Sequence, residues 1–152
     1  MIQRIQTIYL LLAAVACVAC MSMGIGRFFG ADGMLQGRLF NLWIAQADGM
    51  HSLFPWALFA ILLLCATLLV ACIFLYKKLA LQLRVAIFCL VLQVGWYGAY
   101  AAMAWWHCGQ ADAHFRPEWP AALPAVAAVL TFLAMRGIMR DILLLRSLDR
   151  LR

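Results

Sequence analysis

Two sets of residues in this sequence have side chains that can carry out chemistry, and cysteines make up the first. Cys17 and Cys20 form a Cys-x-x-Cys pair, which at an exposed helix start supports thiol–disulfide exchange. Both lie deep inside an apolar stretch, where a thiolate is disfavoured and a thiol behaves as a small hydrophobic group. At helical spacing they join Ala13 and Ala16 in a surface of small residues that lets membrane helices approach closely. We therefore predict a packing role for this pair.

The second set contains imidazole, thiol and carboxylate groups that are predicted to share one side of a membrane: His51, His107, Cys108, Asp112 and His114. Such groups can bind zinc or copper if their loops converge. The spacing from His107-Cys108 to His114 matches no strong metal signature, so we predict neither a metal site nor a bound cofactor.

The apolar stretches themselves contain no Asp, Glu, Lys, Arg or His. Proton relays and ion pathways normally need such a group, so a pump or an ion-coupled transporter is disfavoured. Gln93 and Thr67 are expected to hydrogen-bond between helices. The segment Gly95–Tyr100 pairs Gly95 with Ala99 and Gly98 with Ala102 at four-residue spacing, which predicts a helix-packing face. Its aromatic residues leave open a pocket for a quinone or a lipid.

The elements that must position these residues follow from composition. The chain has 152 residues, of which 68% are hydrophobic and 12% are charged, against about 25% charged in soluble domains. A water-soluble globule and a disordered chain are both excluded. Four apolar stretches approach or reach the roughly 20 residues that a membrane helix needs, namely Thr7–Ile25, Trp56–Tyr76, Val85–Trp106 and Trp119–Met135. We predict a single all-α domain over residues 1–152, with four transmembrane helices in an antiparallel bundle.

Lysine and arginine are distributed unevenly between the two sides of this bundle. Nine of the twelve lie on one side: Arg4, Lys77, Lys78, Arg84, Arg136, Arg140, Arg146, Arg150 and Arg152. The positive-inside rule then predicts that both termini are cytoplasmic. Trp43, Trp56, Trp105, Trp106 and Trp119 fall near the outer boundary, as an aromatic belt does. The net charge of +6 reflects topology and contact with anionic lipid headgroups, and no nucleic-acid partner is expected.

Two segments outside the spans are long enough to form structure. The outer loop, residues 26–52, carries the turn signals Gly33 and Asp48-Gly49, and its segment Arg38–Ile44 is compatible with a short β-hairpin and with an interfacial helix. The tail, residues 136–152, is predicted to continue the last span as a basic cytoplasmic helix. A slight kink is expected near Pro124, within the last span. Candidate contacts to a partner or to lipid headgroups are Arg4, Arg140, Arg146, Asp149, Arg150 and Arg152.

Both ends of the chain resemble a known family. Residues 1–14, MIQRIQTIYLLLAA, resemble the opening of the Bacteroidota family catalogued as domain of unknown function 4293, and residues 145–152, LRSLDRLR, are similar to its close. The resemblance implies a small four-span protein of the bacterial inner membrane. It implies no catalytic residues.

These observations predict a multi-pass inner-membrane protein that is not an enzyme and acts as an accessory or assembly subunit of a larger membrane complex. Its expected partners are membrane lipids and other integral membrane proteins or further copies of itself. The alternatives are a quinone-linked thiol oxidoreductase and a small lipid or solute carrier.

Replacing both Cys17 and Cys20 with alanine separates the packing role from the oxidoreductase. An oxidoreductase should lose its function, whereas a packing surface that already contains alanine should tolerate the change. Complementation of a deletion strain with the double variant measures the difference, and loss of function with normal protein abundance would contradict the packing role.

Overall fold

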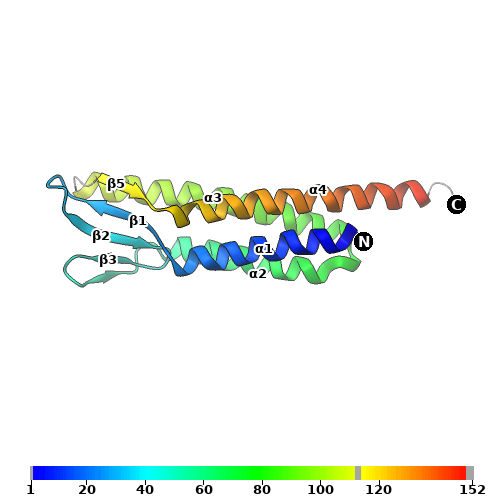
Figure 1. Ribbon diagram of the computed structural model, residues 1–152, viewed down its shortest axis with the longest axis horizontal. Coiled ribbons are helices and arrows are strands. Elements are labelled where there is room, and N and C mark those ends of the chain that lie inside the picture. The colour runs from blue at the N-terminus through cyan, green and yellow to red at the C-terminus, as the bar shows by residue number, and fades with distance from the viewer. Residues whose placement is uncertain (1, 112–113, 150–152) are drawn as a thin grey trace.

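The chain forms a long bundle of helices with a small sheet at one end (Figure 1). The computed structural model describes the backbone of residues 2–111 and 114–149, and the side chains of residues 5–109 and 114–147. Its long helices are α1 (Ile2–Ser22), α2 (Trp56–Phe74), α3 (Leu79–Ala111) and α4 (Leu123–Asp149). Within the described residues, four helical segments are long and apolar enough to cross a membrane, which confirms the four predicted spans as helices.

Each helix packs mainly against two neighbours, α1 and α3 each lying against α2 and α4. The buried positions in every helix recur at alternating spacings of three and four residues. Examples are Leu10, Ala13, Cys17 and Cys20 in α1, Leu58, Leu62, Cys65, Leu69 and Cys72 in α2, and Ala127, Thr131, Ala134 and Ile138 in α4. A repeat of 3.5 residues keeps one seam facing the neighbours along a whole helix.

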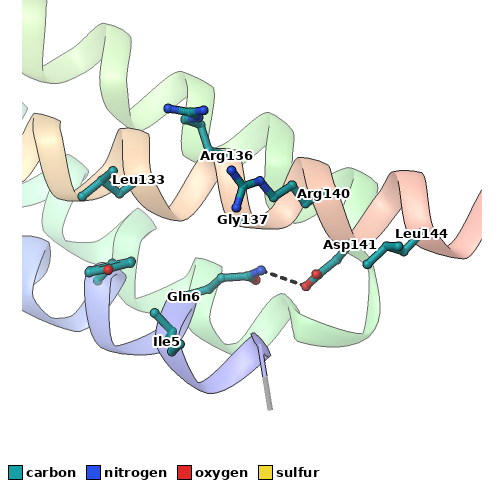
Figure 2. Close-up of a pocket in the computed structure, with 9 residues that line it drawn as sticks. Ile5, Gln6, Leu133, Arg136, Gly137, Arg140, Asp141 and Leu144 are labelled. Carbon is teal, nitrogen blue, oxygen red and sulfur yellow. Dashed lines mark hydrogen bonds between the residues drawn. The ribbon is translucent and has the colours of Figure 1, made fainter.

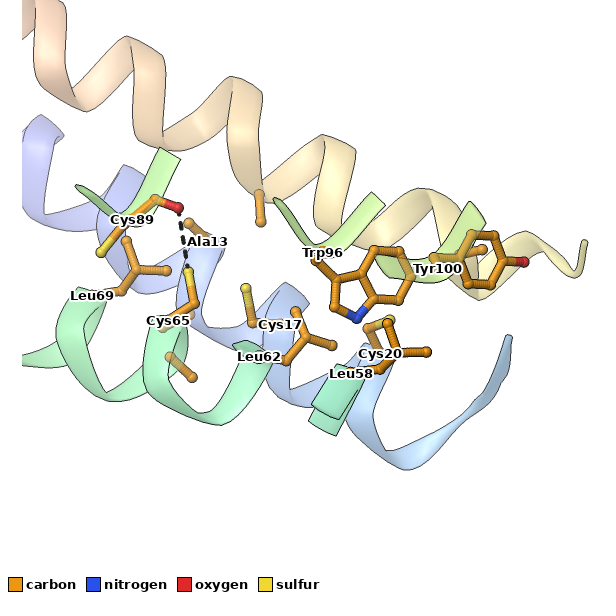
Figure 3. Packing of buried hydrophobic residues seen from close by; sticks show 14 of the residues in the cluster. Ala13, Cys17, Cys20, Leu58, Leu62, Cys65, Leu69, Cys89, Trp96 and Tyr100 are labelled. Carbon is orange, nitrogen blue, oxygen red and sulfur yellow. Dashed lines mark hydrogen bonds between the residues drawn. The ribbon is translucent and has the colours of Figure 1, made fainter. Parts of the chain in front are cut away.

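Small side chains occupy much of this seam (Figure 3). Ala13, Cys17 and Cys20 have no exposed surface, and Cys65 and Cys89 lie beside them in the bundle interior. Lipid chains are as apolar as leucine, so close packing between small residues is what favours helix–helix over helix–lipid contact. Cys17 and Cys20 thus lie in the packed seam, as the predicted packing role requires.

The sheet has five strands: β1 (Gly24–Phe29), β2 (Leu35–Phe40), β3 (Ile44–Gln46), β4 (His51–Ser52) and β5 (His114–Pro117). Their order is β4-β3-β2-β1-β5, and all neighbours are antiparallel. The predicted hairpin is confirmed as β2 and β3, whereas the interfacial helix is wrong. The predicted all-α class is too narrow, because the chain also forms this five-stranded sheet. One of its strands, β5, comes from the connection between α3 and α4.

The ends of the predicted spans also shift. α1 stops at Ser22, so Ile25 belongs to β1 and not to the first span. α3 continues to Ala111, which places His107 and Cys108 on a helix. Two 3₁₀ helices, Leu75–Lys77 and Trp119–Ala122, precede α3 and α4. Pro124 is therefore in the first turn of α4, where its missing N–H breaks no bond and no kink is needed.

The tail is helical through Asp149, and four of the five tryptophans assigned to the aromatic belt are exposed. α4 continues without interruption from the apolar stretch through Asp149, as the predicted tail requires. Trp56, Trp105, Trp106 and Trp119 have 62%, 84%, 58% and 68% of their surface exposed. Trp43 is half-buried against Phe40, with ring centres 5.3 Å apart and ring planes tilted by 32°.

The Glu118 carboxylate bonds to arginine side chains of two neighbouring strands. Arg27 in β1 and Arg38 in β2 are cross-strand partners, and like charges in that relation destabilise a sheet. Glu118 forms an ion pair with Arg27 and a second one with Arg38 at 3.3 Å. The Glu118 backbone N–H also donates to the Ile25 carbonyl at 3.1 Å, so the segment before α4 is tied to the sheet.

Replacing Glu118 with Gln should lower the free energy of unfolding by about 1 kcal/mol, because two half-exposed arginines are left facing each other. Chemical unfolding in detergent measures the loss, with Asp32→Asn, an exposed acidic residue outside the strands, as control. Adding Arg38→Gln to Glu118→Gln should recover part of the loss, and equal effects of the Glu118 and Asp32 changes would contradict this role.

Candidate functional site

The sheet is joined to the bundle by a buried side-chain amide. Asn41 lies in the turn between β2 and β3 and has no exposed surface. Its Nδ2 group donates to the Cys20 carbonyl at 2.7 Å, and its Oδ1 atom accepts from Trp96 Nε1 at 3.1 Å. Cys20 lies near the end of α1, where helix carbonyls lack intrahelical partners. One side chain thus connects the hairpin, α1 and α3.

Two tyrosines of α3 make comparable bonds to backbone carbonyls. The Tyr100 hydroxyl donates to the Ile25 carbonyl at 2.7 Å. Ile25 is the extra residue of a β-bulge, because its neighbours Gly24 and Gly26 pair with consecutive residues of β2. The Tyr97 hydroxyl donates to the Ala121 carbonyl at 2.7 Å and accepts from the Ala125 N–H at 2.9 Å. Trp96 stacks on Tyr100, with ring centres 5.1 Å apart.

These contacts correct the prediction for the segment Gly95–Tyr100. Its aromatic residues form the packed side, and its glycines face outward. A Cβ atom built on Gly95 or Gly98 would meet no other atom within 4 Å, and Ala102 is exposed as well. Trp96 is fully buried in the interior, so it does not line an open pocket for a quinone.

The predicted hydrogen bond between helices is found for Gln93 and not for Thr67. Gln93 is fully buried, and its Nε2 group donates to Thr131 Oγ1 across the α3–α4 contact at 3.3 Å. The Gln93 Oε1 atom has no hydrogen-bond partner. Thr67 is exposed and donates to the Leu64 carbonyl of its own helix, so it does not connect helices.

The histidines are kept apart. His107 lies against the ring of Phe28, with ring centres 4.6 Å apart, while His51 and His114 belong to different edge strands of the sheet. Asp112 lies outside the described residues. Among the residues that are described, no three His, Cys, Asp or Glu side chains come close enough to hold a metal ion.

Of the six residues predicted to contact partners or headgroups, those that the structure describes lie at the end of the bundle opposite the sheet. Arg140 and Arg146 are exposed on α4. Arg4 and Asp149 belong to α1 and α4, but their side chains, like residues Arg150 and Arg152, lie outside the described part. The structure therefore places two of the six side chains.

A groove at this end was missed by sequence reasoning. It lies between α1 and α4, has a volume of about 430 Å³, and adds Gln6, Arg136 and Asp141 to the residues of interest (Figure 2). The Gln6 amide donates to Asp141 Oδ2 at 2.8 Å. Gly137 permits this approach, because a Cβ atom there would lie 2.9 Å from Gln6 Cγ. No periodicity links residues 135 positions apart, so the sequence carries no signal for this pair.

The role of Asn41 in joining the sheet to the bundle can be tested by a double-mutant cycle. Asn41→Ala leaves the Trp96 N–H without its partner in a buried place, which should cost about 1–3 kcal/mol of unfolding free energy. Trp96→Phe removes the same bond from the other side. The two losses should therefore be less than additive, with a coupling of about 0.5–3 kcal/mol. Unfolding in detergent measures all four proteins, and Gln46→Ala on the exposed part of β3 is the control. If the two losses of unfolding free energy were strictly additive, the proposed bond between Asn41 and Trp96 would be contradicted.

No curated protein matches the sequence. A family model described as Domain of unknown function (DUF4293) matches residues 2–151, which is nearly the whole chain. Because the match covers both ends and the residues between them, the chain belongs to the DUF4293 family.

Proposed function

We propose that this protein is a non-enzymatic accessory or assembly subunit of a larger membrane complex. Its bundle is antiparallel and lies in the inner membrane of a Bacteroidota cell, with both termini cytoplasmic. Lys77 and Lys78 follow α2 at the end away from the sheet, and Arg136, Arg140 and Arg146 lie on α4 from its middle onward. Their charge supports this orientation.

The observation that carries the proposal is the outward ridge of α3, formed by Gly95, Gly98 and Ala102. Glycine inside a helix costs about 1 kcal/mol relative to alanine, so it needs a compensating role. Small residues at these spacings let a second helix approach closely within a bilayer. The ridge is unused inside this chain, because nothing lies within 4 Å of a Cβ atom at either glycine. We therefore infer that a transmembrane helix of another subunit packs against this ridge.

The interior supports the same conclusion. Cys17, Cys20, Cys65, Cys72 and Cys89 are fully buried, and the described polar side chains of the bundle interior bond mostly to backbone or to each other. These groups are engaged in holding the chain together. The surface that remains for function is therefore the outside of the helices and the two ends.

Mild-detergent extraction from native membranes, followed by mass spectrometry of stoichiometric companions, tests the proposal. We expect a reproducible protein companion. Gly95→Leu combined with Gly98→Leu should lower its recovery about tenfold, since a lost contact of about 1.4 kcal/mol changes affinity by that factor. Leucine is a better helix former than glycine, so the bundle itself should keep its stability.

The control is Ala71→Leu, which likewise places a leucine where a small residue stood, on the exposed face of α2. It should leave the companion in place. Recovery of the chain alone, or equal loss with both variants, would contradict a subunit held by the α3 ridge. A further copy of the chain as companion would support the ridge as the interface of a homo-oligomer.

A further inference from the structure

The groove between α1 and α4 combines an apolar wall with unpaired positive charge. Ile5, Leu133 and Leu144 line it from both helices. Arg136 and Arg140 stand four residues apart on α4, and the Arg140 side chain runs back along the helix toward Arg136 (Figure 2). Both arginines are exposed, and among the described side chains neither forms an ion pair with a carboxylate.

The acidic group of the groove is already engaged. Asp141 accepts the hydrogen bond from Gln6, whose own surface is 4% exposed, so the carboxylate is held at the contact between α1 and α4. Like charges four residues apart on a helix repel each other. An anion placed between Arg136 and Arg140 would relieve this repulsion, and guanidinium groups bind phosphate through paired hydrogen bonds.

The position of the groove indicates whether the anion is a lipid headgroup or a free phosphate. It lies where the apolar part of α4 ends and the basic tail begins. If α4 spans a bilayer, arginine side chains at this point extend toward the headgroup layer. A free phosphate would use the arginines alone and leave the apolar wall empty. We propose that the groove binds an anionic phospholipid, with its phosphate between Arg136 and Arg140 and an acyl chain along Ile5 and Leu133.

This proposal requires that the chain span a membrane, and it is independent of any partner protein. The test therefore uses the full-length chain purified alone in a neutral detergent. Phosphatidylglycerol and phosphatidylcholine with the same acyl chains are titrated separately, and native mass spectrometry counts the lipid that each protein molecule retains. Glycerophosphoglycerol, which is the headgroup without chains, and inorganic phosphate are titrated as competitors.

The main variant is Arg136→Gln combined with Arg140→Gln. Its control, Lys77→Gln combined with Arg84→Gln, removes the same charge from exposed residues near the same end of the bundle, outside the groove. We expect the groove variant to bind phosphatidylglycerol about 10- to 30-fold more weakly, and the control to bind it nearly as the unchanged protein does. A thermal melt of each protein verifies that the bundle is intact.

A second variant, Leu133→Trp, fills the apolar wall without changing charge. It should also weaken phosphatidylglycerol binding, which a site for free phosphate would not predict. Equal weakening by the two charge variants, no preference over phosphatidylcholine, or equal binding of inorganic phosphate and the lipid would each overturn the proposal.

Discussion

The rest of the structure depends on the buried Asn41 amide, which bonds at once to the Cys20 carbonyl and to the Trp96 indole. A sheet placed at the end of an apolar bundle has few ways to fix its orientation, because hydrophobic contact is non-directional. Hydrogen bonds in a buried site are directional, and leaving their partners unpaired is expensive. Asn41 therefore determines how the β2–β3 turn sits on α1 and α3.

Two tyrosines of α3 add further hydrogen bonds to the backbone near the sheet and near the start of α4. Tyr100 reaches the bulge carbonyl of Ile25, and Tyr97 reaches the backbone that leads into α4. Because these side chains point inward, the glycines between them must point outward at helical spacing. The geometry that fixes the sheet thus also produces the open ridge of Gly95 and Gly98 on which the proposed function rests.

The opposite end of the bundle is organised by a second polar contact. Gln6 and Asp141 hold α1 and α4 together, and Gly137 leaves room for the Gln6 side chain. Since the carboxylate is used in this contact, the neighbouring Arg136 and Arg140 keep their charge available at the groove. The two ends therefore differ: one is closed by a sheet with paired charges, and the other is open and basic.

The sequence by itself determined what composition and local periodicity encode. Apolar runs the length of a bilayer predict helices at α1 to α4, and the residues Cys17 and Cys20 were recognisable as packing residues because their surroundings are apolar. Only the tertiary structure decided the pairing of β1 with β5, the contact of Gln6 with Asp141, and the outward direction of Gly95 and Gly98. Helices that are apolar on all sides carry no pattern that tells the buried face from the lipid-facing one. Contacts between residues far apart in the chain depend on how those faces meet, which local spacing does not contain.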